Sequence, residues 1–317
     1  MIWLTWRQQR TEILMAMGLM GLLASFLVAS ALSMQNTFHQ LGVGPCLGAH
    51  PGQACSNIVQ TFDSSVASIT SVSGWLNFVP LTFALLLGAP LVLELEQGSF
   101  RLSWTQSTTR TRWLVIKLLT IAALTVVFAV ACTELMTFWR IPLDRIGGSF
   151  APNDGFDLEG LLPPAYGLFA VAVGLSAGAV LRRTVPAAVI SIAVFLPVRL
   201  AFQTFVRPYL QSPVKMIVPM MSPLSPAHGA WIMTSTFSDR HGHVLPNSSP
   251  IFAACAHASG AKGTFLSCLN AHHVFSYTVY QPGSRFWAFQ GMEAGIFTAV
   301  ALILFVFVFW FVKTKVS

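Results

Sequence analysis

Long apolar stretches recur along the chain, separated by polar connections. A helix that crosses about 30 Å of hydrocarbon needs roughly 20 apolar residues, because lipid offers the backbone no hydrogen-bond partners. Six stretches are long enough, so the pattern predicts transmembrane helices at about residues 13–34, 75–93, 113–138, 161–181, 186–206 and 286–312. The first is too long for the apolar core of a signal peptide, and no convincing cleavage site follows it, so we expect it to be retained.

Composition supports a membrane protein. Hydrophobic residues make up 54% of the chain and charged residues only 9%, whereas a soluble domain carries roughly 25% charged residues. The net charge of +7 does not indicate a nucleic-acid partner, because the basic residues lie scattered beside the apolar stretches. We predict an all-α integral membrane protein in which residues 1–317 form one transmembrane domain.

Basic residues near the ends of the apolar stretches predict the orientation. If the N-terminus is cytoplasmic, the short inner segments contain Arg7, Arg10, Arg101, Arg110, Arg112, Lys117, Arg182, Arg183, Lys313 and Lys315. The longer outer segments contain the more dilute set Arg140, Arg145, Arg207, Lys215, Arg240, Lys262 and Arg285. We therefore expect both termini in the cytoplasm.

Four of the five cysteines fall in segments that this orientation places outside, where disulfides form. Cys46 and Cys55 lie in the first outer segment, and Cys255 and Cys268 lie in the last. The arrangement favours two local disulfides, although four cysteines allow three connectivities. Cys132 lies within the third predicted helix.

No ATP site is visible in the sequence. A phosphate-binding loop needs a glycine-rich turn that ends in Gly-Lys-Ser/Thr after a strand. The nearest match, at residues 260–264, has the wrong spacing and lies in an outer segment. We therefore expect no catalytic residue and no cofactor in this chain.

The connection between the second and third predicted helices, residues 94–112, carries the most informative pattern. Two acids leave the membrane, a glycine breaks the helix, an amphipathic turn follows, and basic residues lead into the next helix. The residues are Glu-x-Glu-x-Gly-Ser-x-Arg-Leu at 94–102, Trp-Thr-Gln-Ser at 104–107 and Thr-Arg-Thr-Arg-Trp at 109–113, followed by Lys117. In these motifs and in its opening Trp-Leu-Thr-Trp-Arg-Gln-Gln-Arg, the sequence resembles permease subunits of bacterial ABC-2 type transporters, especially those of actinobacteria.

This resemblance implies a bacterial cell-membrane protein with an interfacial helix at 1–12 and a cytoplasmic coupling helix at 98–109 that docks into a separate ATPase subunit. It assigns ATPase coupling to Glu94, Glu96, Gly98, Ser99, Arg101, Trp104, Arg110 and Arg112. It further implies two permease chains, identical or related, and two ATPase chains that bind ATP and Mg²⁺. Read from the residues alone, the two glutamates are equally well explained as solvated helix caps.

Three ionisable residues lie in the outer halves of predicted helices: Glu134, Arg199 and Glu293. A charge within the bilayer costs at least about 2.5 kcal/mol unless it is paired or hydrated, and these three lie at comparable depth. They form a candidate outer gate or a polar lining of the export path. A static ion pair, or side chains that extend to the interface, explains the same residues.

The last outer segment, residues 207–285, is too long for a simple connection, so we expect a folded cap. Its apolar stretch at 214–224 is too short to span the membrane and is broken by Pro219 and Pro223, which favours a re-entrant or interfacial segment. Six of the eight histidines lie between His228 and His273. Because they lack helical His-x-x-x-His spacing, we expect a polar cap and no metal site.

Together these features favour the membrane subunit of an ATP-driven exporter of a hydrophobic or amphiphilic substrate, such as a drug, a lipid or a peptide. The alternatives are a lipid-modifying membrane enzyme, and a receptor or immunity protein that uses the outer cap. Only the exporter requires a co-purifying ATPase.

Overall fold

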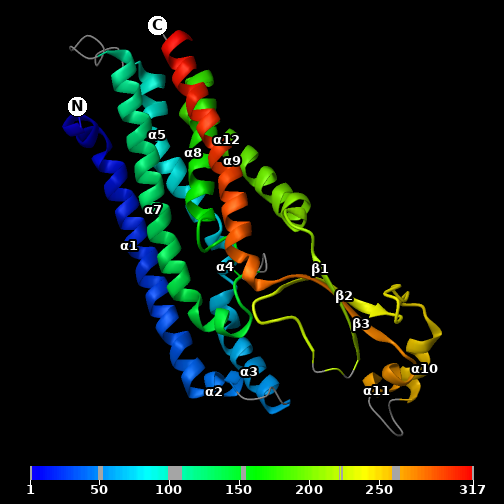
Figure 1. Ribbon diagram of the computed structural model, residues 1–317. Coiled ribbons are helices and arrows are strands. Elements are labelled where there is room, and N and C mark those ends of the chain that lie inside the picture. The colour runs from blue at the N-terminus through cyan, green and yellow to red at the C-terminus, as the bar shows by residue number, and fades with distance from the viewer. Residues whose placement is uncertain are drawn as a thin grey trace.

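Among the residues that the structure describes, six helices are long and apolar enough to cross a membrane, which makes this a multi-pass membrane protein: Arg10–Gln40, Ser73–Gln97, Arg110–Ile146, Leu162–Leu181, Thr184–Tyr209 and Gly283–Lys315. The computed structural model describes residues 2–48, 53–98, 109–150, 155–220, 222, 224–258 and 265–315. The long helices form a bundle with both chain termini at one end and a small sheet at the other (Figure 1). We call these the terminal end and the sheet end.

The predicted spans are confirmed, and most extend beyond their predicted ends. The long helices are α1 (Ile2–Gln40), α5 (Val79–Gln97), α7 (Arg110–Ile146), α8 (Leu162–Leu181), α9 (Thr184–Ala201) and α12 (Phe286–Lys315). α9 continues through a π turn at Phe202–Val206 and a 3-10 turn at Arg207–Tyr209. Three shorter helices join α1 to α5: α2 (Val43–Gly48), α3 (Gln53–Thr70) and α4 (Ser73–Leu76).

The interfacial helix predicted at residues 1–12 falls within α1, which runs from Ile2 to Gln40. Glycine and proline, the residues that most strongly end a helix, are absent from the sequence before Gly18. The candidate span within α1 begins at Arg10, so the interfacial position of the residues before it stays a prediction.

α8 lies at the centre of the bundle and packs against α5, α7, α9 and α12. Small residues allow this close packing, as is common between membrane helices. At Gly178 a Cβ atom would lie 2.4 Å from the side chain of Val92 on α5, and at Gly88 it would lie 3.0 Å from Val171. A glycine on each of the two helices thus allows α5 and α8 to approach closely.

The sheet was not predicted. Its strands β1 (Val214–Pro219), β2 (Trp231–Ser238) and β3 (Phe275–Gln281) pair antiparallel in the order β1-β3-β2. β1 lies in the stretch expected to be re-entrant or interfacial. It is a strand and not a re-entrant helix, and its side chains alternate between half-buried and exposed as in an edge strand. Pro219 ends the strand, where a missing N–H is tolerated.

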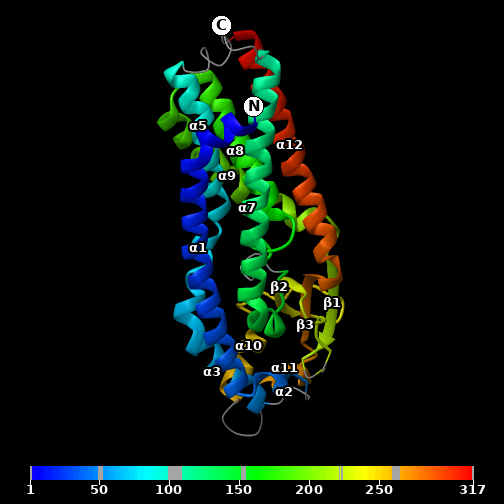
Figure 2. The ribbon, with the colours of Figure 1, turned by 90° about the vertical axis from the view of Figure 1, so that its left-hand side faces the viewer.

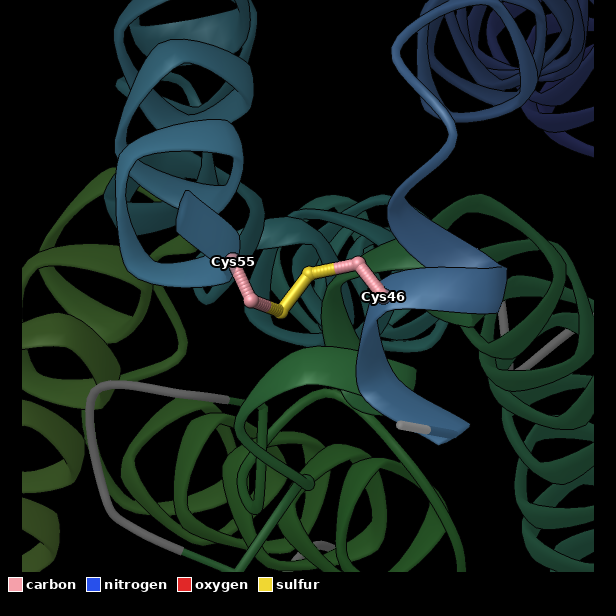
Figure 3. Close-up of a disulfide and its surroundings, with 2 residues drawn as sticks. All are labelled: Cys46 and Cys55. Carbon is pink, nitrogen blue, oxygen red and sulfur yellow. A yellow bond between two sulfur atoms is a disulfide. The ribbon is translucent and has the colours of Figure 1, made fainter. Parts of the chain in front are cut away.

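The sheet end also carries both disulfides. Cys46–Cys55 joins α2 to α3 (Figure 3), and Cys255–Cys268 joins α10 (Pro250–Ala258) to α11 (Phe265–Ala271). The two predicted local pairs are therefore confirmed, and Cys132 is free and buried in α7. Figure 2 shows that α2, α3, α10 and α11 all lie at the end of the bundle opposite the termini.

Candidate functional site

The connection after α5 begins at the terminal end with a left-handed glycine. Gly98 has φ of +69°, which ends α5 in the conformation that glycine adopts most readily. One turn earlier, Glu94 forms an ion pair with Lys117 of α7, with Oε1 and Nζ 2.6 Å apart. Lys117 is buried, so this pair fixes α5 against α7 where an unpaired ammonium would be costly.

Glu96 closes a second contact at the terminal end. Its Oε2 accepts hydrogen bonds from the backbone N–H of Thr184, at 2.8 Å, and from its hydroxyl, at 2.7 Å. Thr184 is the first residue of α9, so the carboxylate satisfies a free N–H and lies at the positive end of the helix dipole. Both glutamates therefore have partners within the chain.

The remaining predicted coupling residues divide into two groups. Arg110 and Arg112 are exposed in the first turn of α7, where the Thr109 side chain accepts a hydrogen bond from the Arg112 N–H at 3.3 Å. Ser99, Arg101 and Trp104 lie outside the described residues. The exposed arginines and the end of α5 therefore face the same end of the bundle as the termini (Figure 1).

A buried network of five ionisable residues lies towards the sheet end: Asp157, Tyr166, Arg199, Arg207 and Glu293. Arg207 is its centre and is fully buried. Its Nε and Nη2 donate to the two carboxylate oxygens of Glu293 at 2.7 and 2.8 Å, and Nη2 also donates to Asp157. The Tyr166 hydroxyl donates to Glu293 at 2.5 Å and lies 3.1 Å from Asp157. We call this the ion network.

Arg199 forms the edge of the ion network. It donates to the backbone carbonyl of Asn77 at 3.0 Å and to its side-chain oxygen at 2.5 Å, and it lies 3.4 Å from an Asp157 oxygen. Two arginines and two carboxylates balance in charge, which offsets the cost of burying each of them. The network thereby joins α8, α9, α12 and the loop before α8 in one arrangement.

Of the candidate gate residues, the structure brings Arg199 and Glu293 into this network, where Asp157 and Tyr166 connect them. Glu134 is exposed on α7, and no hydrogen bond or ion pair joins it to the other two within the described chain. Sequence reasoning missed Asp157, Tyr166 and Arg207. Their signal was weak, because an acid in a loop, a tyrosine at a span's start and an arginine after one are ordinary interfacial residues.

A second cluster of charged residues, apart from the ion network, consists of Arg140, Asp144 and Glu159. Arg140 Nε is 3.1 Å from a Glu159 oxygen, and Arg140 Nη2 donates to Asp144 at 3.0 Å. Burial, followed by the charge and hydrogen bond of Asp144, raises the pKa of the Glu159 carboxyl to about 8, against the opposing effect of Arg140. Near neutral pH the carboxyls of Glu159 and Asp144 therefore share one proton.

The chain offers little for a metal in its described part. Cys255, Cys268 and His272 are the one group there with ligand atoms close enough to share an ion. The two sulfurs are bonded to each other and so are not available as thiolate ligands.

The His243 ring lies 3.0 Å from Asp239 in the exposed turn after β2, and hydrogen bonds from His243 lower the pKa of the Asp239 carboxyl.

Comparison with known proteins adds one match. Residues 17–207 match the family model described as "ABC-2 membrane transporter related". This range begins within the first span and ends within the fifth, and it includes the connection after α5 and Asp157, Tyr166, Arg199 and Arg207 of the ion network. No curated protein and no solved structure matches the chain.

Proposed function

This chain belongs to the ABC-2 membrane transporter related family, and on that premise we propose that it is the transmembrane subunit of an ATP-driven exporter. A second permease chain, identical or related, completes the path for a hydrophobic or amphiphilic substrate. A separate ATPase subunit binds ATP and Mg²⁺ and hydrolyses the nucleotide. The family match carries this proposal, because it runs through the connection at 94–112 where such a subunit would dock.

The proposed orientation places the terminal end in the cytoplasm. Exposed basic residues gather there beside the spans: Arg110, Arg112, Arg182, Arg183 and Lys313. Positive charge beside short connections favours the cytoplasmic side. Both disulfides lie at the opposite end, which suits an oxidising exterior. The two indications are independent, since one rests on charge and the other on thiol chemistry.

The contacts made by the last turn of α5 suggest how motion of the ATPase would reach the substrate path. The Glu94–Lys117 pair ties the end of α5 to α7, and the Glu96–Thr184 contact ties it to the start of α9. A displacement of the connection therefore acts on three spans together. α9 carries that displacement to Arg199 and Arg207, which belong to the ion network at the far end.

The proposal is tested by capture of the ATPase. The tagged full-length chain is purified from crosslinked native membranes, and bound ATPase is measured by mass spectrometry and by vanadate-sensitive ATP hydrolysis. Arg112→Glu should lose most of the bound ATPase, because it reverses an exposed charge beside the connection. Arg240→Glu, at an exposed arginine of the sheet end, is the matched control and should retain it. Capture of no ATPase by the wild-type chain would refute the exporter.

A further inference from the structure

An apolar groove of about 650 Å³ runs between α8, α9 and α12. Its wall includes Leu181 of α8, Val194 of α9 and Leu304 of α12. The one hydroxyl among the described residues of the wall belongs to Ser176, and it donates to the carbonyl of Ala172 in the same helix at 2.7 Å. We call this the α9 groove. Its wall therefore offers an occupant apolar surface.

The α9 groove is about as long as one leaflet of a bilayer. Its α8 residues run from Phe169 to Leu181, which is about 18 Å at 1.5 Å of rise per residue, and half of a hydrocarbon layer is about 15 Å. At one end the rings of Phe202 and Phe297 lie 5.2 Å apart, and Phe297 contacts Tyr166 of the ion network. Leu181 marks the other end, where α8 ends. The groove thus has the length of an acyl chain in a single leaflet.

The Leu181 end of the groove is basic. Arg182 and Arg183 directly follow Leu181, and both are exposed. Arg182 Nη2 donates to the backbone carbonyl of Lys315 at 3.2 Å, which brings the end of α12 beside the two arginines. None of these three side chains forms an ion pair with an acid in the described part of the chain. They are therefore available to a ligand at the terminal end.

Helix periodicity places two of these charges on the faces that line the groove. On α12, Phe307 of the wall is followed at intervals of four residues by Phe311 and Lys315. On α9, Ile190 of the wall lies two helical turns after Arg183. The apolar wall and the basic end therefore form one continuous surface.

One acid lies near this basic end. Glu96 accepts two hydrogen bonds from Thr184, the residue after Arg183. It offsets one positive charge, and Arg182, Lys313 and Lys315 still leave this end positive. Any lipid chain could fill an apolar groove, but basic pockets between helices on the cytoplasmic side favour anionic head groups, by about fivefold in affinity per Lys or Arg. The charge thus selects the class of lipid.

We propose that the α9 groove binds an anionic phospholipid, with an acyl chain along the groove and the head-group phosphate at Arg182, Arg183 and Lys315. A lipid held there links the ends of α8, α9 and α12 at the membrane surface. Binding needs neither a transported substrate nor an ATPase, so failure to bind lipid and failure to capture an ATPase are separate results.

The test measures which lipid the full-length chain retains. The chain is purified from micelles of a neutral detergent that contain equal amounts of phosphatidylglycerol and phosphatidylcholine with identical acyl chains, and bound lipid is counted by native mass spectrometry. Phosphatidylglycerol should be retained over phosphatidylcholine by at least about tenfold. Arg183→Gln combined with Lys315→Gln should lower that preference by at least about fivefold. Lys215→Gln combined with Arg240→Gln, which removes two exposed charges at the sheet end, is the matched control and should keep it.

A second variant tests the groove without changing its charge. Val194→Trp puts an indole ring into the wall and should lower the retention of phosphatidylglycerol by at least about fivefold. Val189→Trp is the matched control, because Val189 is exposed on α9 and does not line the groove. Equal retention of the two lipids, an equal loss of preference in the sheet-end control, or unchanged retention in Val194→Trp would overturn the proposal. So would a wild-type dimer that Val194→Trp converts to a monomer, because the occupant of the groove would then be a second copy of the chain.

Discussion

Removal of one charge from the ion network should destabilise the chain strongly. Glu293 is fully buried and accepts two hydrogen bonds from Arg207 and one from Tyr166. Glu293→Gln preserves its size but leaves two arginines against Asp157 alone. Breaking a buried ion pair from one side costs about 3–5 kcal/mol, which lowers the ratio of folded to unfolded chain by about 10² to 10⁴.

The double variant separates charge from packing. Arg207→Gln combined with Glu293→Gln removes one charge of each sign and leaves Arg199 beside Asp157, 3.4 Å apart. Its cost should be smaller than the sum of the two single costs by about 1–3 kcal/mol. Unfolding of the purified chain by titration with SDS in mixed micelles, followed by tryptophan fluorescence, measures all three variants.

Glu134→Gln is the matched control for this experiment. Glu134 is exposed on α7, so the same chemical change there should alter the free energy of unfolding by no more than about 0.5 kcal/mol. The reasoning would be refuted if Glu293→Gln cost no more than this control. It would also be refuted if the two single costs added without coupling.

Three further predictions concern other parts of the fold. Replacing Cys255 and Cys268 by Ala should lower the stability of the α10–α11 region by about 2–4 kcal/mol, measured by thermal proteolysis, because the unfolded segment loses a crosslink. Stability should fall as the pH rises from about 4.5 to about 8, by at most about 1.4 kcal/mol per pH unit. In that range the raised pKa of Glu159 means that the folded chain holds a proton which the unfolded chain releases. Glu159→Gln should flatten that profile. Gly178→Ala should cost about 1–3 kcal/mol, since the new methyl group would lie 2.4 Å from Val92, and Val92→Ala should restore part of the loss.

Each of these has an outcome that contradicts it. Unchanged proteolysis after loss of the disulfide would mean that the cap is held by packing alone. A stability profile that is flat or rises from about pH 4.5 to about pH 8 would show that Glu159 is not buried as a protonated acid. If Gly178→Ala were as neutral as Gly291→Ala, whose new methyl group meets open space, α5 and α8 would not be in close contact.

The sequence by itself determined the spans, because a bilayer accepts only long apolar helices and each such stretch is visible locally. α8 began one residue from its predicted start and ended where predicted, between prolines at its beginning and arginines after it. The two local disulfides were also visible, since each pair of cysteines is close in sequence and both lie in long polar segments. The amphipathic pattern at 94–112 pointed to the family that the match over residues 17–207 shows.

Only the tertiary structure decided which distant residues meet. Arg207 and Glu293 are 86 residues apart, and no local pattern indicates that a residue just after one span pairs with a residue near the start of another. β3 lies between β1 and β2 although it follows both in the chain, so the pairing that makes β1 a strand comes from a segment some 60 residues away. Helix formation in a bilayer satisfies the backbone locally, whereas ion pairing and strand pairing depend on how the whole chain packs, and that is why the spans were predictable and the ion network was not.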